Sequence, residues 1–279
     1  GGGIFGGIMD ERAIGVFDSG LGGLTAVREL RKILPGEDIV FFGDTGRVPY
    51  GSRSPEVIRK YAAECLHFLE KQNVKMIIVA CGTVSSVFGD DLQNTFSVPC
   101  MGVVEPAVKA AVSATKNGKI GLIATAATVA SRSYEKLAAE LLPDAEFTAK
   151  ACPLFVPLVE NGYFGADCEV TRLVAKDYLA AFDGKDIDTL ILGCTHYPLL
   201  YNLIDKLTGY KLWLIDSGGE AALAAKKFLE ERDMLSGREH GEMKFFVTDK
   251  IEGFAKLAEE FLGEQLQNVT RLDAEALGE

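Results

Sequence analysis

The chain has 279 residues, of which 48% are apolar and 25% are charged, and it carries a formal net charge of −11 with a pI near 4.9. An acidic chain without a run of lysine and arginine is poorly suited to nucleic acid or to an anionic membrane surface, so we expect neither as a partner. The longest apolar runs, such as 76–80, are far too short to cross a bilayer. The length predicts one large or two medium-sized domains.

The cysteines and the N-terminal residues indicate the compartment. Six cysteines occur without a Cys-x-x-Cys pair, and a chain this long and apolar does not need disulfides for stability. We therefore expect reduced thiols in a cytoplasmic enzyme. Residues 1–12, GGGIFGGIMDER, lack the basic start and the apolar run of a signal peptide, and we expect a flexible arm there.

Short apolar runs rich in Val, Ile and Phe alternate with amphipathic stretches along most of the chain. Nine such runs predict strands, at 13–17, 38–43, 75–80, 100–104, 119–124, 147–151, 188–193, 211–215 and 244–248. Most of these runs are apolar throughout and do not alternate between apolar and polar residues. This pattern is typical of parallel strands covered by helices on both faces. Between them, Ser54 as N-cap and Pro55 at the first helical position predict the start of a helix. This alternation predicts an α/β fold.

The two halves of the chain resemble each other. One predicted strand leads to Cys81 in IIVACGT, and another leads to Cys194 in LILGCTH. Each is preceded, at a similar distance, by a strand that ends near Asp18 or Thr125. We expect two similar α/β domains with mainly parallel sheets that face each other across a central cleft. Ligands bind beyond the carboxyl ends of such strands, so both cysteines would reach that cleft.

The domain boundaries that we expect follow from this duplication. The first α/β domain would comprise residues 13–104 together with 214–268, and the second would comprise residues 105–213. Residues 269–279 would form a C-terminal tail.

Two of the six cysteines stand apart from the others. Most unpaired cysteines are inert core thiols, which is the interpretation we give to the other four. Cys81 and Cys194 each follow a buried strand and precede residues that can hydrogen-bond a ligand, at 82–83 and 195–196. A helix dipole at the strand end would lower the pKa of such a thiol and make it reactive, whereas a neighbouring carboxylate would keep it protonated.

The turn DSGLGG at 18–23 lies between a predicted strand and a predicted helix. Its glycines are consistent with a tight turn alone. A dinucleotide-binding turn is excluded because Thr25 stands where the third glycine should be, and there is no Gly-Lys-Ser/Thr phosphate loop. A small anion held by Ser19 and backbone N–H groups remains an alternative. Residues 44–45 and 49–52 are ordinary turn residues that could form a lip of the same cleft.

His196 follows Cys194 by two positions. Tetrahedral zinc would need two further ligands, and no suitable spacing of Cys or His supplies them, so we expect no metal. A role in acid–base catalysis, or in setting the reactivity of the Cys194 thiol, fits His196 better. Glu160, in PLVENGYFG, is by default a surface carboxylate.

Several blocks of the sequence resemble glutamate racemases. They are GVFDSGLGGLTAVREL (15–30), GDTGRVPYGSRS (43–54), ACGTVSS (80–86), TAATVASRSY (125–134), PLVENG (157–162) and LGCTHYPLL (192–200). They occur in order over nearly the whole chain, and the first and last are the most specific. The resemblance implies an isomerase of the glutamate racemase type, which works without a cofactor and supplies D-glutamate for peptidoglycan.

The same resemblance implies the roles of five residues. Cys81 would take the α-proton from D-glutamate and Cys194 from L-glutamate. Asp18 would assist Cys81, while Glu160 and His196 would assist Cys194. This agrees with the chemistry, because inversion of a stereocentre by proton exchange needs a base on one face of the α-carbon and an acid on the other.

The resemblance also implies the substrate contacts and the assembly. Contacts with glutamate would come from Asp18, Ser19, Tyr50, Gly51, Gly82, Thr83, Thr195 and His196. A homodimer is the expected assembly.

One position departs from the family. Glutamate racemases commonly read Cys-Asn-Thr in this block, whereas the chain has Gly82 after Cys81. Loss of a side-chain hydrogen bond typically costs about 0.5–1.5 kcal/mol. The departure leaves open a racemase that acts on aspartate. A non-catalytic regulator of a protein partner is a further alternative, although the presence of both cysteines argues against it.

Overall fold

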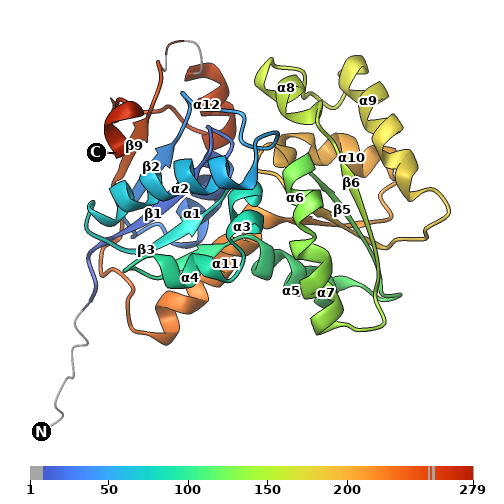
Figure 1. The fold of residues 1–279 in the computed structure, drawn as a ribbon, viewed down its shortest axis with the longest axis horizontal. Helices are drawn as coiled ribbons and strands as arrows, with labels where there is room; N and C mark the ends of the chain where they lie inside the picture. The colour runs from blue at the N-terminus through green and yellow to red at the C-terminus, as the bar shows by residue number, and fades with distance from the viewer. Residues whose placement is uncertain (1–8, 251, 253–254, 279) are drawn as a thin grey trace, which may run out of the picture.

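Two parallel β-sheets covered by helices make up the protein, as a computed structural model shows for residues 9–250, 252 and 255–278 (Figure 1). The first sheet has the order β10 (Val269–Arg271), β9 (Met243–Val247), β2 (Ile39–Gly43), β1 (Ala13–Asp18), β3 (Val74–Val79) and β4 (Cys100–Gly102). The second has the order β6 (Glu146–Ala151), β5 (Lys119–Ala124), β7 (Thr189–Leu192) and β8 (Trp213–Asp216). Neighbouring strands pair in parallel throughout both sheets. The predicted α/β class with parallel sheets is therefore confirmed.

Helices follow most of the strands in the described part of the chain. The α-helices are α1 (Leu24–Ile33), α2 (Pro55–Glu70), α3 (Gly82–Phe88), α4 (Asp91–Thr95), α5 (Val104–Ala114), α6 (Ala126–Ser131), α7 (Ser133–Leu141), α8 (Phe155–Glu160), α9 (Glu169–Leu179), α10 (Tyr201–Leu207), α11 (Ser217–Glu231) and α12 (Ala255–Leu262). Short 3-10 turns are η1 (Ala180–Phe182), η2 (Tyr197–Leu200) and η3 (Glu275–Gly278). The start of α2 is as predicted, because the Ser54 hydroxyl accepts a hydrogen bond from the Val57 N–H and Pro55 is the first helical residue.

The central strands are buried on both faces, which explains their continuous apolar sequences. Along β1, Val16 packs into the core that includes α1 and α11, whereas its neighbour Phe17 packs into the core that includes α2. On β3, Ile78 and Ile77 divide between the two faces in the same way. The strand ends, rather than the strand faces, are therefore free to carry polar side chains.

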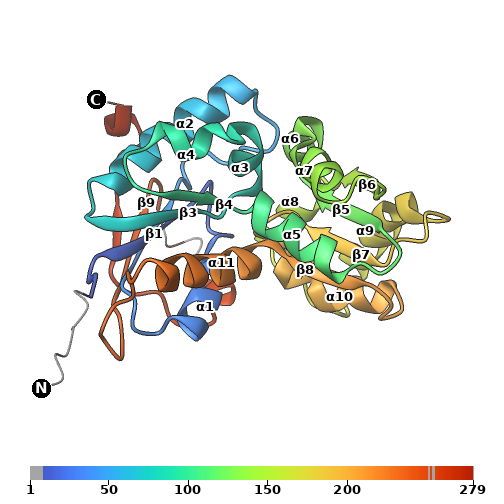
Figure 2. The same cartoon turned by 90° about the horizontal axis from the view of Figure 1, so that it is seen from below.

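The connection between the two halves runs through α11, which follows β8 and packs against α1 of the first half and α5 of the second (Figure 2). One core cluster includes residues of both halves, among them Val16, Leu190 and Ala222. The two halves therefore share one of their apolar cores.

Two strands differ from the expected domain boundaries. β8 pairs with β7 of the second sheet, so the boundary expected at residue 214 divides this strand. β10, at 269–271, pairs with β9 of the first sheet, where we expected a tail. Three residues of strand show no periodicity in the sequence, and the choice of sheet for an apolar run depends on tertiary pairing. The division into two domains stays our prediction, with these two strands reassigned.

The expected flexible arm is only partly within the described residues, since residues 1–8 lie outside them. Residues 9–12 have no regular secondary structure. The Asp10 carbonyl nevertheless accepts a hydrogen bond of 2.8 Å from the buried Lys75 ammonium, and the Glu11 carboxylate accepts one of 3.0 Å from the Gly237 N–H. This stretch is therefore held against the body of the protein. No helix in the described part of the chain is long and apolar enough to cross a membrane.

Candidate active site

Polar and thiol side chains gather where strands of the two sheets end. β1 ends at Asp18, β3 is followed by Cys81, and β7 is followed by Cys194. The helix after Cys81, α3, lies beside α6 and α7 of the second half (Figure 2). The site is therefore built from the carboxyl ends of strands of both sheets, as expected for ligand sites in parallel sheets.

Cys81 is buried beside a carboxylate of its own half. Its side chain is 5% exposed, and its thiol donates a hydrogen bond of 3.5 Å to the Ser19 hydroxyl. Burial, and after it the charge of Asp18, raises the pKa of Cys81 to about 12. Burial, with the carboxylate adding to it, outweighs the helix dipole, and the Cys81 thiol is held protonated.

Asp18 is held in place by the turn that follows β1. One of its oxygens, Oδ2, accepts hydrogen bonds of 2.9 Å from the Gly23 N–H and 3.3 Å from the Gly20 N–H. The turn needs glycine at position 23, because a Cβ there would lie 2.5 Å from the Cβ of Asp18. The other oxygen, Oδ1, is buried without a partner in the described part of the chain. Burial raises the pKa of Asp18.

Cys194 lies beside a histidine–carboxylate pair. Its sulfur is 3.7 Å from His196 Nδ1, and His196 Nε2 is 3.0 Å from Glu160 Oε1. Burial lowers the pKa of His196, but the hydrogen bonds to Cys194 and Glu160 outweigh it and bring the pKa to about 10. The imidazole of His196 therefore lies between the sulfur of Cys194 and the carboxylate of Glu160. Glu160, the last residue of α8, lies at the surface as the default interpretation has it, and its carboxylate is directed at His196.

The segment after β1, which follows Asp18, packs directly on the turn after β7, which carries Cys194. The Thr25 hydroxyl, at the start of α1, donates a hydrogen bond of 3.2 Å to the Thr195 carbonyl. A Cβ at Gly22 would lie 2.4 Å from the Thr195 hydroxyl. The charge of Cys194 also contributes to the raised pKa of Cys81, so the two thiols are within electrostatic reach of each other.

The remaining predicted contact residues lie around the same junction. The Thr83 hydroxyl is 2.8 Å from the Thr125 hydroxyl of the second half. The Gly51 carbonyl accepts a hydrogen bond from the Ala127 N–H, and a Cβ at Gly51 would lie 2.9 Å from the Cβ of Thr125. The Tyr50 hydroxyl, in contrast, donates to the carboxylate of Asp44, so it is already occupied. The eight predicted contact positions thus lie at strand ends or on the turns and the helix start that follow them.

A family model described as Asp/Glu/Hydantoin racemase matches residues 22–225 of the chain. The chain belongs to this racemase family. The glutamate racemase of Geobacter metallireducens is 42% identical over 269 residues, which cover 96% of this chain and 99% of that protein. The glutamate racemase of Chlorobaculum tepidum is 45% identical over 264 residues, which cover 94% of this chain and 96% of that protein. The predicted family, and with it an enzyme of the isomerase class, is confirmed.

Solved structures agree with this family assignment. A glutamate racemase from Francisella tularensis, in complex with D-glutamate, matches with a TM-score of 0.89 at 38% identity, over 96% of this chain and all of that one. An aspartate racemase from Picrophilus torridus matches with a TM-score of 0.58 at 16% identity and shares the fold alone. The two-domain racemase fold is therefore common to this chain and its relatives.

Gly82 is the position at which this racemase departs from the common block. It is the first residue of α3, and a Cβ there would lie 2.4 Å from the carbonyl oxygen of Gly193. Any other residue would require the two halves to move apart at this point. The missing side chain thus leaves no added room, because the backbone of the opposite half occupies that space.

Thr125 is a member of this junction that the sequence analysis did not place in the site. It follows β5 as the N-cap of α6, with its hydroxyl accepting from the Thr128 N–H. Its position after a strand end matches those of Asp18, Cys81 and Cys194. That repeated placement was the signal that could have identified it.

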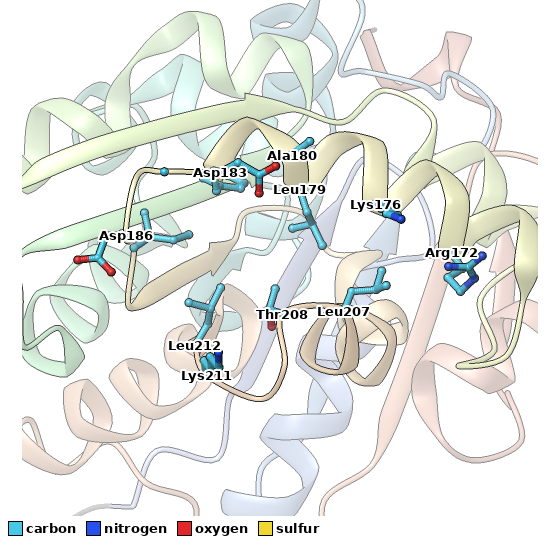
Figure 3. Close-up of a pocket in the computed structure, with 13 residues that line it drawn as sticks. Arg172, Lys176, Leu179, Ala180, Asp183, Asp186, Leu207, Thr208, Lys211 and Leu212 are labelled. Carbon is cyan, nitrogen blue, oxygen red and sulfur yellow. The ribbon is translucent and has the colours of Figure 1, made fainter.

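A pocket of about 610 Å³ lies elsewhere, between α9, η1 and the end of α10 (Figure 3). Lys176, Asp183 and Leu207 are among its lining residues, and none of the predicted site residues lines it. Arg172 at its edge is already paired with Glu169 at 2.6 Å. This pocket therefore takes no part in the chemistry at the strand ends. In the described part of the chain, no group of three His, Cys, Asp or Glu side chains could hold a metal ion.

Proposed function

We propose that this protein is a glutamate racemase that interconverts L- and D-glutamate by a two-cysteine proton transfer without a cofactor. The observation that carries the proposal is the pair of thiols, Cys81 and Cys194, each placed at a strand end of a different sheet and each with its own acid–base partner. The proposal is further supported by relatives named glutamate racemase that match over nearly their whole length.

The reaction assigns opposite tasks to the two thiols. With D-glutamate, the thiolate of Cys81 takes the α-proton, and the thiol of Cys194 delivers its own proton to the opposite face of the resulting carbanion. The product is L-glutamate, and the thiol of Cys81 and the thiolate of Cys194 return to their starting states by proton exchange with water. With L-glutamate the roles of the two sulfurs are reversed.

Each thiol needs a partner because its resting state does not suit both tasks. Cys81, held protonated by burial, becomes a base when Asp18 accepts its proton, and Asp18 has a free oxygen for that purpose. Cys194 exchanges its proton with His196, whose charge is balanced by Glu160. The buried, pre-arranged dipoles around the carbanion supply most of the remaining reduction of the barrier.

The direct test uses pure protein and L-glutamate in D₂O. We expect the α-proton to be replaced by deuterium and the optical rotation to fall to zero without any added cofactor. Retention of the rotation at high enzyme concentration would contradict the proposal.

Aspartate is the alternative substrate that Gly82 raised. A Cβ at this position would overlap the Gly193 carbonyl, so the glycine is explained by close packing and not by a changed substrate. We therefore expect glutamate turnover to exceed aspartate turnover by a wide margin, which parallel assays of the two amino acids measure. Faster turnover of aspartate than of glutamate would identify aspartate as the substrate instead.

We further propose that the enzyme acts in the cytoplasm as a homodimer and supplies D-glutamate for peptidoglycan. The support is the likeness to glutamate racemases, since D-glutamate is the product of that reaction. Expression of the chain should restore growth of a bacterium that requires external D-glutamate, and the Cys81→Ala variant should not. Restoration by both would point instead to a binding role that does not need the chemistry.

A further inference from the structure

Tyr134 is a buried residue of the second half that the mechanism above does not use. It is the second residue of α7, it is 1% exposed, and its ring packs in the apolar cluster that contains Ile191 and Ile215. Its hydroxyl has no hydrogen-bond partner in the described part of the chain. A buried polar group without a partner typically costs about 1–3 kcal/mol, so such a group requires an explanation.

The position of the Tyr134 hydroxyl provides an explanation for its lack of a partner. A Cβ built on Gly82 would lie 3.7 Å from the Tyr134 oxygen and 2.4 Å from the Gly193 carbonyl oxygen. Gly82 directly follows Cys81, and Gly193 directly precedes Cys194. The hydroxyl therefore lies at the junction of the two turns that carry the thiols, near the contact of α3 with α7 (Figure 2).

Ser217 is the polar side chain that acts on this hydroxyl. Ser217 donates its own hydrogen bond, of 2.8 Å, to the Leu192 carbonyl. Burial, followed by the charges of Cys194 and Cys81, raises the pKa of Tyr134, although Ser217 acts in the opposite direction. The phenol therefore stays protonated and is available as a hydrogen-bond donor.

A second unpartnered polar atom lies on the opposite half. It is Oδ1 of Asp18, which is an acceptor, whereas Tyr134 offers a donor. An α-amino acid carries an ammonium group that donates and a carboxylate that accepts, both bonded to the carbon that must lie between the two sulfurs. The Tyr134 donor thus matches the α-carboxylate in polarity, whereas Asp18 Oδ1 is the oxygen that takes the proton of Cys81 in the proposed mechanism.

We propose that the Tyr134 hydroxyl donates a hydrogen bond to the α-carboxylate of the amino-acid substrate, an inference that rests on the proposed racemase function. Removal of the α-proton moves negative charge onto that carboxylate, so a donor fixed there binds the transition state more strongly than the substrate. Tyr134 is then a catalytic residue contributed by the second half, in addition to the Cys194 group.

The test is Tyr134→Phe, which removes the hydroxyl and leaves the ring. We expect kcat to fall about 10²-fold in both directions, with a smaller change in KM, because the bond strengthens in the transition state. The melting temperature should not fall, since the hydroxyl has no partner to lose in the unliganded protein.

Tyr178→Phe is the matched control. The hydroxyl of Tyr178 accepts a hydrogen bond of 3.0 Å from the Leu154 N–H, away from the thiols. This variant should lower the melting temperature and keep kcat.

Three results would be decisive against the inference. Wild-type kcat and KM in Tyr134→Phe would overturn the role of the hydroxyl while leaving the racemase function intact. A lower melting temperature with unchanged kcat would assign the hydroxyl a structural role and also overturn it. Wild-type protein that fails to racemise glutamate in the same assay would overturn the proposed function and this inference together.

Discussion

The two thiols of the site have opposite electrostatic surroundings. On the first half, burial and a carboxylate raise the pKa of Cys81 to about 12. On the second half, Cys194 faces a histidine whose own pKa is about 10, so that a positive charge lies 3.7 Å from its sulfur. A racemase must be able to start with either enantiomer, and in the mechanism proposed above each thiol has a different acid–base partner, Asp18 for Cys81 and His196 for Cys194.

The largest expected effect comes from removal of either thiol. Cys81→Ala and Cys194→Ala should each lower racemisation by about 10²–10⁴-fold in both directions, because an acid and a base are both required. Chiral analysis of the product measures this. Cys168→Ala, which removes a half-buried thiol outside the junction, should retain full activity. Activity in Cys81→Ala or Cys194→Ala equal to that of Cys168→Ala would contradict the requirement for both thiols.

The histidine–carboxylate pair should matter less than the thiol it serves. Glu160→Gln keeps the size of the side chain but removes the charge that helps hold His196 protonated. We expect kcat to fall by about 10- to 10²-fold, and the alkaline limb of the pH–rate profile to move to lower pH, as the pKa of His196 falls. An unchanged profile would show that Glu160 does not control His196.

The close packing at Gly82 should produce a moderate effect on stability. In Gly82→Ala the added methyl group would meet the Gly193 carbonyl at 2.4 Å, and overpacking of this kind costs about 1–3 kcal/mol. Urea unfolding and glutamate turnover should both be impaired. Gly165→Ala, at a position with open space, is the control and should be neutral. Equal stability of the two variants would show that the halves do not meet at Gly82 in solution.

A further expected effect is a pH dependence of stability. The folded protein raises the pKa of His196 from 6.5 to about 10, so its contribution to stability is complete below pH 6.5 and is lost as the pH rises through 10. The difference in free energy of unfolding between wild type and His196→Gln should therefore shrink over this range. Denaturation at several pH values measures it, and a constant difference would contradict the assignment of charge to His196.

Sequence reasoning was most successful where a local pattern sufficed. The nine predicted strands are all present within two residues, because a continuous apolar run is a local property. β10 was not predicted, because it has only three residues and forms by pairing with β9. Which sheet receives β8 depends on its pairing with β7, the strand before it in the chain, and no pattern within β8 itself carries that information.

The candidate site divides in the same way. Cys81 and Cys194 were recognisable from their positions after strands, and Asp18, Glu160 and His196 from resemblance. Properties that arise only when the halves meet were not predictable. The occupied hydroxyl of Tyr50, the contact of Thr83 with Thr125 and the overlap that excludes a side chain at Gly82 all depend on the distance between the two halves.

The measurement that tests the two-thiol account most directly is α-deuterium exchange by single variants, followed by NMR with each enantiomer in D₂O. In Cys81→Ala, Cys194 should still remove and return the α-proton of L-glutamate, so that deuterium enters L-glutamate without formation of D-glutamate, while D-glutamate stays unlabelled. Cys194→Ala should show the mirror result, with exchange into D-glutamate alone. Exchange into both enantiomers by either variant would contradict the placement of one thiol on each face of the substrate.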